Sequence, residues 1–149
     1  MANGFEEAAK IEPVRIRGLD GQDVGGNFYE LVGGSATFEK LAKKFYEGIA
    51  ADEVLKPMYP AEDLDGATRR LQLFLEQYWG GPTTYQEERG HPRLRMRHNP
   101  YKINQDARQR WLNCMEAAVD SLSLPPLQKA EMWAYFDRAA TSMLNTFED

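Results

Sequence analysis

Both histidines of the chain lie in one short basic segment. Residues 90–98 read Gly-His-Pro-Arg-Leu-Arg-Met-Arg-His, so His91 and His98 flank three arginines in a chain whose net charge is −5. A neutral imidazole is the commonest metal ligand among side chains, and guanidinium groups pair well with carboxylates. The segment therefore combines residue types that could bind a metal ion and an anionic group together.

Three interpretations of the histidines are open from the residues alone. An isolated histidine in a soluble chain is most often a surface or hydrogen-bonding residue. A zinc site is disfavoured, because Cys114 and two histidines have no recognised zinc-binding spacing. The third interpretation is one histidine bound to a haem iron, with neighbouring arginines paired to the two haem propionates.

Under the third interpretation, the second histidine lies too close in sequence to reach the opposite face of the flat macrocycle. Hydrogen-bond donors on that face must then be other side chains, and the candidates are Tyr46, Tyr59 and Trp111. The alternative is that these three are core aromatics, each with one satisfied hydrogen bond. The arginines also have alternatives, as a solvated basic loop or as a site for another anion.

Composition excludes several classes of protein. A chain of 149 residues with 42% hydrophobic and 11% aromatic residues is typical of one globular domain. The negative net charge disfavours a nucleic-acid partner or a polybasic membrane contact. No run approaches the ~20 apolar residues of a membrane span. A single cysteine and no apparent signal peptide predict a cytoplasmic protein, and without a C-x-x-C-H motif haem cannot be attached in the c-type manner.

The chain divides into a polar N-terminal extension, residues 1–26, and a domain over residues 27–149. The extension has no sustained hydrophobic periodicity, so we expect it to be mobile or to pack onto the domain late in folding. A turn or two of helix over 27–31 should end at Gly33-Gly34, and Ser35 should cap the next helix. That helix has one apolar face, which consists of Phe38, Leu41, Phe45 and Ile49.

Three more helices are predicted. A short turn beginning at Asp52 should stop before Pro57. A helix over about 64–78 carries an apolar stripe of Leu64, Ala67, Leu71, Leu75 and Tyr78, with Arg69, Arg70 and Glu76 facing solvent. Residues 83–103 should form a loop with one or two short helical pieces. Asn104 should cap a helix that Pro125-Pro126 ends, and its apolar face consists of Trp111, Met115, Ala118 and Leu122. A last helix starts near residue 127, and its apolar face consists of Trp133, Phe136, Ala140, Leu144 and Phe147. Because no strand-like alternation is sustained, the predicted fold class is all-α.

Several runs of residues carry a family resemblance. They are Phe28-Tyr29-Glu30-Leu31-Val32-Gly33-Gly34, Phe45-Tyr46, Asp52-Glu53-Val54-Leu55, Phe74-Leu75-Glu76-Gln77-Tyr78-Trp79-Gly80-Gly81-Pro82 and the basic run from Gly90 to His98. In this order they closely resemble the truncated haemoglobins of group II, the O type of actinobacteria. The resemblance covers about residues 27–147 and leaves the N-terminal extension outside.

The resemblance implies a two-over-two helical sandwich around non-covalent haem b, with His98 as the proximal iron ligand. Tyr46 falls on the distal tyrosine of the second helix, and Tyr59 on the following corner, where the O type also has tyrosine. Trp111 falls on the tryptophan that identifies groups II and III. Ala67 takes the place of the distal histidine of ordinary globins, and Leu71 lies one turn further. We expect Leu71, Met96 and Arg95 or Arg97 to contact the cofactor, the arginine through a propionate.

The function implied is binding of O₂ and other diatomic ligands, CO and NO, at the histidine-ligated iron. Because bound O₂ takes on negative charge, hydrogen bonds from Trp111 and a tyrosine should slow its release. The alternative is a redox enzyme, either an NO dioxygenase or a peroxidase-like protein that acts on peroxide. Sustained turnover would need an external reductase, since the chain has no flavin or nicotinamide motif. The sequence leaves open whether the protein forms a homo-oligomer.

Overall fold

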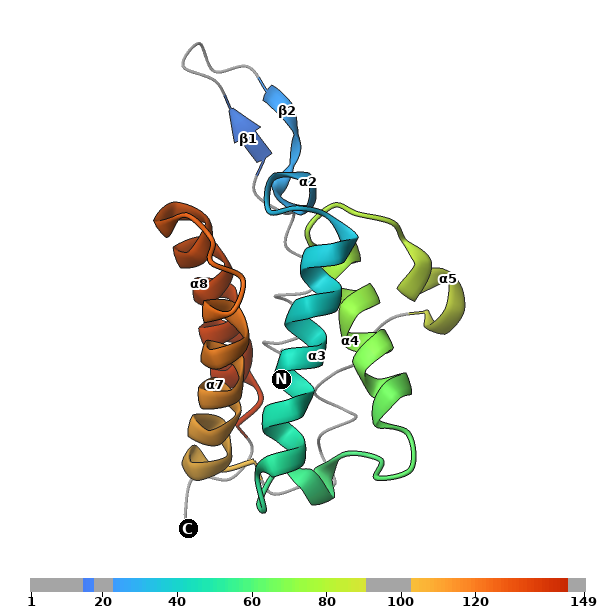
Figure 1. Ribbon diagram of the computed structural model, residues 1–149, viewed down its shortest axis with the longest axis vertical. Helices are drawn as coiled ribbons and strands as arrows, with labels where there is room; N and C mark the ends of the chain where they lie inside the picture. The colour runs from blue at the N-terminus through green and yellow to red at the C-terminus, as the bar shows by residue number, and fades with distance from the viewer. Residues whose placement is uncertain (1–14, 18–22, 91–102, 145–149) are drawn as a thin grey trace.

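The computed structural model describes residues 15–17, 23–90 and 103–144, and its body is helical. Helix α3 (Ser35–Ala51) packs against both α4 (Leu64–Tyr78) and α7 (Gln105–Asp120), and α7 packs against α8 (Pro126–Ser142) (Figure 1). The body thus consists of two helix pairs in contact through α3 and α7. The predicted all-α fold class is confirmed.

Short elements connect these helices. They are α2 (Phe28–Leu31), the 3-10 helix η1 (Lys56–Met58) and α5 (Thr84–Arg89). The turn predicted to stop before Pro57 instead runs into η1, because proline is tolerated in the first turn of a helix, where its missing N–H leaves no hydrogen bond unmade. Asn104 caps α7 as predicted, since its Oδ1 accepts the N–H of Ala107 at 2.9 Å.

The N-terminal extension contains regular structure that the sequence did not predict. Strands β1 (Arg15–Arg17) and β2 (Asp23–Asn27) pair antiparallel as a hairpin that projects from the helical body (Figure 1). Strands this short carry too few residues for a period of two to be detected. At the end of the hairpin, Asn27 donates to the carbonyl of Gly80 at 2.7 Å and accepts the N–H of Glu30 at 3.1 Å. The hairpin and α2 are therefore joined to the end of α4.

Two predictions around the start of α3 are wrong. Gly34, with φ 69°, occupies the N-cap position, and Ser35 is the first helical residue. The Ser35 hydroxyl donates instead to the carboxylate of Glu76, at 3.2 Å. Glu76 was expected to face solvent but is only 3% exposed, and Gln72 also donates to it, at 2.8 Å. The buried face of α4 is wider than its apolar stripe because the helix packs against α3, and this polar contact satisfies the carboxylate.

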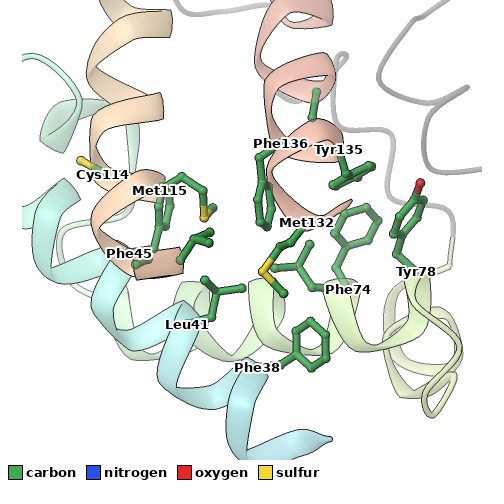
Figure 2. Packing of buried hydrophobic residues seen from close by; sticks show 14 of the residues in the cluster. Phe38, Leu41, Phe45, Phe74, Tyr78, Cys114, Met115, Met132, Tyr135 and Phe136 are labelled. Atoms are coloured by element: carbon green, nitrogen blue, oxygen red, sulfur yellow. The ribbon is translucent and has the colours of Figure 1, made fainter. Parts of the chain in front are cut away.

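The core lies between the two helix pairs. Phe38, Leu41 and Phe45 of α3 meet Met115 of α7 and Met132 of α8, and all are at most 1% exposed (Figure 2). The sequence missed other members of this core, notably Phe74, Trp79, Tyr85, Met132, Tyr135 and Ala139. Among the described residues, no helix is both long and apolar enough to cross a bilayer.

Helices α3 and α7 approach closely at one glycine. A Cβ atom added at Gly48 would lie 2.9 Å from the Sγ atom of Cys114. Real Cβ atoms essentially never come so near another heavy atom, so any larger residue at this position would push the helices apart. Gly48 therefore allows the close spacing between α3 and α7.

Candidate functional site

A cavity of about 440 Å³ opens between the two helix pairs. Its walls come from α3, the corner around η1, α4, α5, α7 and α8, and most of the side chains are apolar or aromatic. The lining residues are Phe45, Tyr46, Leu55, Met58, Tyr59, Pro60, Ala67, Arg70, Leu71, Phe74, Leu75, Tyr85, Arg89, Ile103, Ala107, Arg108, Trp111, Tyr135, Phe136, Ala140 and Met143.

The structure brings the three predicted distal aromatics together on one wall of this cavity. Tyr46 comes from α3, Tyr59 from the chain after η1 and Trp111 from α7, and we call these three residues the corner cluster. The rings of Tyr46 and Tyr59 lie edge-on, with centroids 5.4 Å apart and planes at 88°. Phe45 packs edge-on against both Tyr46, at 5.1 Å, and Trp111, at 5.3 Å. Segments far apart in sequence thus present two hydroxyls and one indole at the same wall.

Both hydroxyls of the corner cluster remain protonated. Burial raises the pKa of Tyr59, the neighbouring Tyr46 raises it further, and the Trp111 indole lowers it by acting as a hydrogen-bond donor. Burial also raises the pKa of Tyr46, against a smaller effect of the Arg70 charge. A protonated phenol can donate a hydrogen bond as well as accept one, whereas an indole can only donate. The wall therefore holds two phenol hydroxyls and one indole N–H that can serve as hydrogen-bond donors.

Asp52 fixes the corner that carries Tyr59. Its carboxylate accepts the backbone N–H groups of Val54 and Leu55, both at 2.9 Å, and also receives the guanidinium of Arg110 at 3.3 Å. Burial acts to raise the pKa of Asp52, but the hydrogen bonds from Leu55, Val54 and Arg110 outweigh it and lower the pKa. Arg110 directly precedes Trp111, so this ion pair ties α7 to the corner.

Apolar residues occupy the adjoining wall. Ala67 and Leu71 both line the cavity from α4, one turn apart, as their spacing predicts. The methyl group of Ala67 cannot donate a hydrogen bond. Polar contact with a ligand in this part of the cavity therefore depends on the corner cluster.

Three arginines also line the cavity. Arg89 directly precedes the basic run, and Arg70, which was expected to face solvent, lies at the cavity because its helix packs beside it. The third is Arg108 of α7. Arg70 pairs with Asp63 at 3.3 Å, and Arg108 pairs with Asp137 at 2.9 Å. The position of Arg70, three residues after Ala67 on the same helix, is the signal that could have placed it at the cavity.

The predicted proximal residues lie outside the described part of the chain. These are His98, Arg95, Arg97 and Met96, together with the alternative ligand His91. Within residues 15–17, 23–90 and 103–144, no group of three or more His, Cys, Asp or Glu side chains could hold a metal ion. The choice of His98 as an iron ligand therefore rests on the sequence.

The described residues fit a haem group. The cavity volume of about 440 Å³ lies in the range of sites that enclose small ligands and cofactors, and such sites are mostly apolar with a few placed polar groups. The aromatic walls suit a flat apolar macrocycle, and the guanidinium groups of Arg70, Arg89 and Arg108 suit its two carboxylates.

Comparison with known proteins identifies the family. The family of bacterial-like globins matches residues 27–145. The group 2 truncated haemoglobin YjbI of Bacillus subtilis is 38% identical over 120 residues, which make up 80% of this chain and 89% of the relative. The chain belongs to the group II truncated haemoglobins.

Solved structures of this family have the same fold as this globin. A thermostable haemoglobin from the actinobacterium Thermobifida fusca is 60% identical and has a TM-score of 0.79, over 82% of this chain and 99% of the other. A truncated oxygen-avid haemoglobin from Bacillus subtilis is 37% identical with a TM-score of 0.75, over 80% and 100% of the two chains. The resemblance seen in the sequence motifs is confirmed.

Membership of the truncated haemoglobins settles the class of cofactor and ligand. As a globin, the protein holds haem and binds gaseous ligands such as O₂.

Proposed function

We propose that this truncated haemoglobin encloses non-covalent haem b in the 440 Å³ cavity, with His98 as the axial ligand, and retains O₂ through hydrogen bonds from the corner cluster. The single observation that carries the proposal is the convergence of Tyr46, Tyr59 and Trp111 on one wall of an otherwise apolar cavity. Haem supplies an iron atom at which O₂, CO or NO binds.

The residues of the chain decide how long such a ligand stays. Trp111 is a fixed donor, because its indole N–H has no acceptor function and its ring is held by Phe45 at 5.3 Å. Tyr46 and Tyr59 keep their protons, since burial raises the pKa of both. A hydrogen bond to a charged acceptor contributes about 1.5–3 kcal/mol, or roughly one to two decades in dissociation rate. Slow release of O₂ follows, and the oxygen-avid relative from Bacillus subtilis supports it.

The basic segment would supply the iron ligand. His98 would bind the iron, and Leu71 and Met96 would contact the macrocycle. Arg95 or Arg97 pairs with a propionate, and Arg70, Arg89 and Arg108 are further cations at the cavity. Guanidinium groups suit this role because their planar fork matches a carboxylate.

A second candidate function is redox catalysis, either oxidation of NO to nitrate or reduction of peroxide with electrons from an external reductase. Tight retention of O₂ suits reactions at the iron better than delivery. Oxidisable rings at the cavity, Tyr46, Tyr59 and Trp111 among them, favour this candidate.

Absorption spectra of the purified protein test the proposal. The oxidised, reduced and CO-bound forms should show non-covalent haem b with one histidine ligand. His98→Ala should lose most of the haem or the histidine-ligated spectrum, while His91→Ala is the matched control because it removes the neighbouring imidazole. If His98→Ala keeps a normal spectrum and His91→Ala abolishes it, the assignment of the axial ligand is wrong.

A further inference from the structure

The charged side chains that line the cavity are all positive. Among the described lining residues they are Arg70, Arg89 and Arg108, and no carboxylate accompanies them, although the whole chain carries a net charge of −5. Haem brings two carboxylates, so three guanidinium groups leave at least one positive charge without a counterpart on the cofactor. The surroundings of each arginine indicate which charge that is.

Arg70 is the arginine whose charge reaches the corner cluster. It lines the cavity together with Tyr46, and its positive charge acts to lower the pKa of the Tyr46 hydroxyl, against the larger opposing effect of burial. Arg108 is instead held by α8, because its guanidinium donates to Asp137 at 2.9 Å and to Thr141 at 3.0 Å. Arg70 is therefore the cation on the same side of the cavity as the distal donors.

The ion pair that Arg70 makes is weak enough to be exchanged. A single contact of 3.3 Å joins its guanidinium to the carboxylate of Asp63, a side chain that is 54% exposed. The neighbouring Arg69 makes two shorter hydrogen bonds to Glu88, at 2.7 and 3.0 Å. Exposed ion pairs contribute little free energy. Because the Arg70 side chain is only 30% exposed and lines the cavity, an anion inside the cavity can compete with Asp63 for it.

A neutral ligand does not need a cation at this wall, whereas an anion does. Moving an anion from water into an apolar cavity costs free energy unless hydrogen bonds and an opposite charge replace its hydration. The protonated Tyr46 hydroxyl can donate to such an anion, and a guanidinium forms hydrogen bonds that its charge strengthens. Arg70 and Tyr46 thus provide both contributions at one place.

We propose that Arg70 extends the ligands of this cavity from neutral diatomic molecules to small monovalent anions, by pairing with an anion bound beside the corner cluster. Asp63 and the anion are alternative partners of the same guanidinium. Binding is reversible and transfers no electron. The inference rests on the proposed haem site, and it deepens that proposal by naming a second class of ligand and the residue that selects it.

Azide titrations of the ferric, haem-loaded protein test this role at neutral pH, where azide is an anion. Nitric oxide, a neutral ligand of the same ferric iron, is the reference, and the measured quantity is the ratio of the two affinities in absorption spectra. Arg70→Gln should lower the azide-to-NO ratio by about ten-fold, because a hydrogen bond to a charged group is lost. Asp63→Asn should raise the ratio several-fold, because it releases the guanidinium.

Asp63→Asn is a suitable variant because Asp63 also caps α4 by accepting the N–H of Gly66 at 3.1 Å, and asparagine caps a helix equally well. Arg69→Gln is the matched control. It removes the same charge from the adjacent position of α4, but Arg69 pairs with Glu88 and is not a lining residue of the cavity. The azide-to-NO ratio should therefore stay unchanged in Arg69→Gln.

The NO-bound spectrum and the melting temperature verify that each variant is folded and loaded with haem. The role of Arg70 is overturned if Arg70→Gln gives the same azide-to-NO ratio as Arg69→Gln, or if Asp63→Asn does not raise it. A protein without a haem spectrum would instead overturn the proposed function.

Discussion

Two groups of rings in this protein have the same residue types and different geometry. One is the corner cluster on the cavity wall, and the other is Tyr78, Trp79 and Tyr135, the stacked cluster, which reaches the cavity through Tyr135. Each contains two tyrosines and one tryptophan, but Tyr46 and Tyr59 meet at 88° whereas Tyr78 and Tyr135 lie within 30° of parallel. Three separate segments bring the side chains of Tyr46, Tyr59 and Trp111 to one cavity wall, where each can donate a hydrogen bond to a ligand. Tyr78 and Tyr135 instead pack ring face on ring face, and Trp79 does not line the cavity. The same residue types therefore serve as hydrogen-bond donors in one place and as core packing in the other.

The elements explain this difference. The corner cluster draws its residues from α3, the irregular chain after η1 and α7, and three independent backbones allow three different ring directions. The stacked cluster comes from the end of α4, where Tyr78 and Trp79 are adjacent, and from one turn of α8. Tyr78 and Trp79 share one stretch of backbone, and Tyr78 stacks on Tyr135 of the neighbouring helix with ring centroids 4.2 Å apart.

The largest effect is expected for the tryptophan of the corner cluster. Trp111→Phe keeps an aromatic ring against Phe45 but removes the only side-chain group there that is a donor alone. Loss of a hydrogen bond to a charged acceptor should accelerate O₂ dissociation by about one to two decades. Stopped-flow displacement of O₂ by CO measures the rate. Trp133→Phe, outside the cavity, is the control, and an unchanged rate in Trp111→Phe would show that the tyrosines alone retain the ligand.

A smaller effect on the O₂ dissociation rate is expected for the tyrosine pair. Its diagnostic feature is non-additivity. Tyr46→Phe and Tyr59→Phe each remove one hydroxyl and leave the other free to turn toward the ligand, because the rings are only 5.4 Å apart. The double variant should therefore release O₂ faster than the sum of the two single changes in activation free energy predicts. The measurement is a double-mutant cycle on the O₂ dissociation rate. Strict additivity would show that the two hydroxyls act independently, and the corner cluster would then not be a network.

The sequence predicted the corner cluster better than the stacked cluster, and physical reasons account for this. Helical spacing placed Ala67, Leu71 and Trp111 on inward faces, and the family motifs brought in Tyr46 and Tyr59. Tyr135 was missed because the apolar face of the last helix was drawn through Trp133 and Phe136. The helix buries Met132, Tyr135, Phe136, Ala139 and Ala140, so its inward face includes Phe136 and Ala140 as predicted but is centred nearer Tyr135 than Trp133.

Helical periodicity also could not predict the hydrogen bonds and ion pairs between residues far apart in the sequence. Glu76 reads as a solvent-facing residue because glutamate is rarely buried unless paired, and its partner Ser35 lies 41 positions away. The guanidinium of Arg108 at the cavity depends on the crossing of α7 and α8 in the same way, through Asp137. Local patterns predicted which helices form and where they end, whereas contacts between helices decided which polar residues are buried.

The smallest effect is expected from the ion pair that supports the corner cluster. Asp52→Asn keeps an oxygen that can accept the N–H groups of Val54 and Leu55, but it removes the charge that pairs with Arg110 at 3.3 Å. Hydrogen bonds hold the pKa of Asp52 below its ordinary value of 3.8, against the opposing effect of burial. The carboxylate therefore stabilises the fold at every pH above that value, and this contribution is lost as the pH falls through the lowered pKa. Melting temperatures of Asp52→Asn and the intact protein should differ slightly at neutral pH and converge in strong acid.

Asp106→Asn provides the control for this ion pair. Asp106 receives the same Arg110 guanidinium at 2.8 Å, but both residues belong to α7, so the bond does not cross to the corner. Only Asp52→Asn should change the environment of Tyr59 and Trp111, and the C–O stretching frequency of the CO-bound protein reports that environment directly. A shift in Asp52→Asn with none in Asp106→Asn would show that the ion pair positions the corner cluster. Equal frequencies in both variants would mean that the backbone hydrogen bonds of Asp52 hold the corner without its charge.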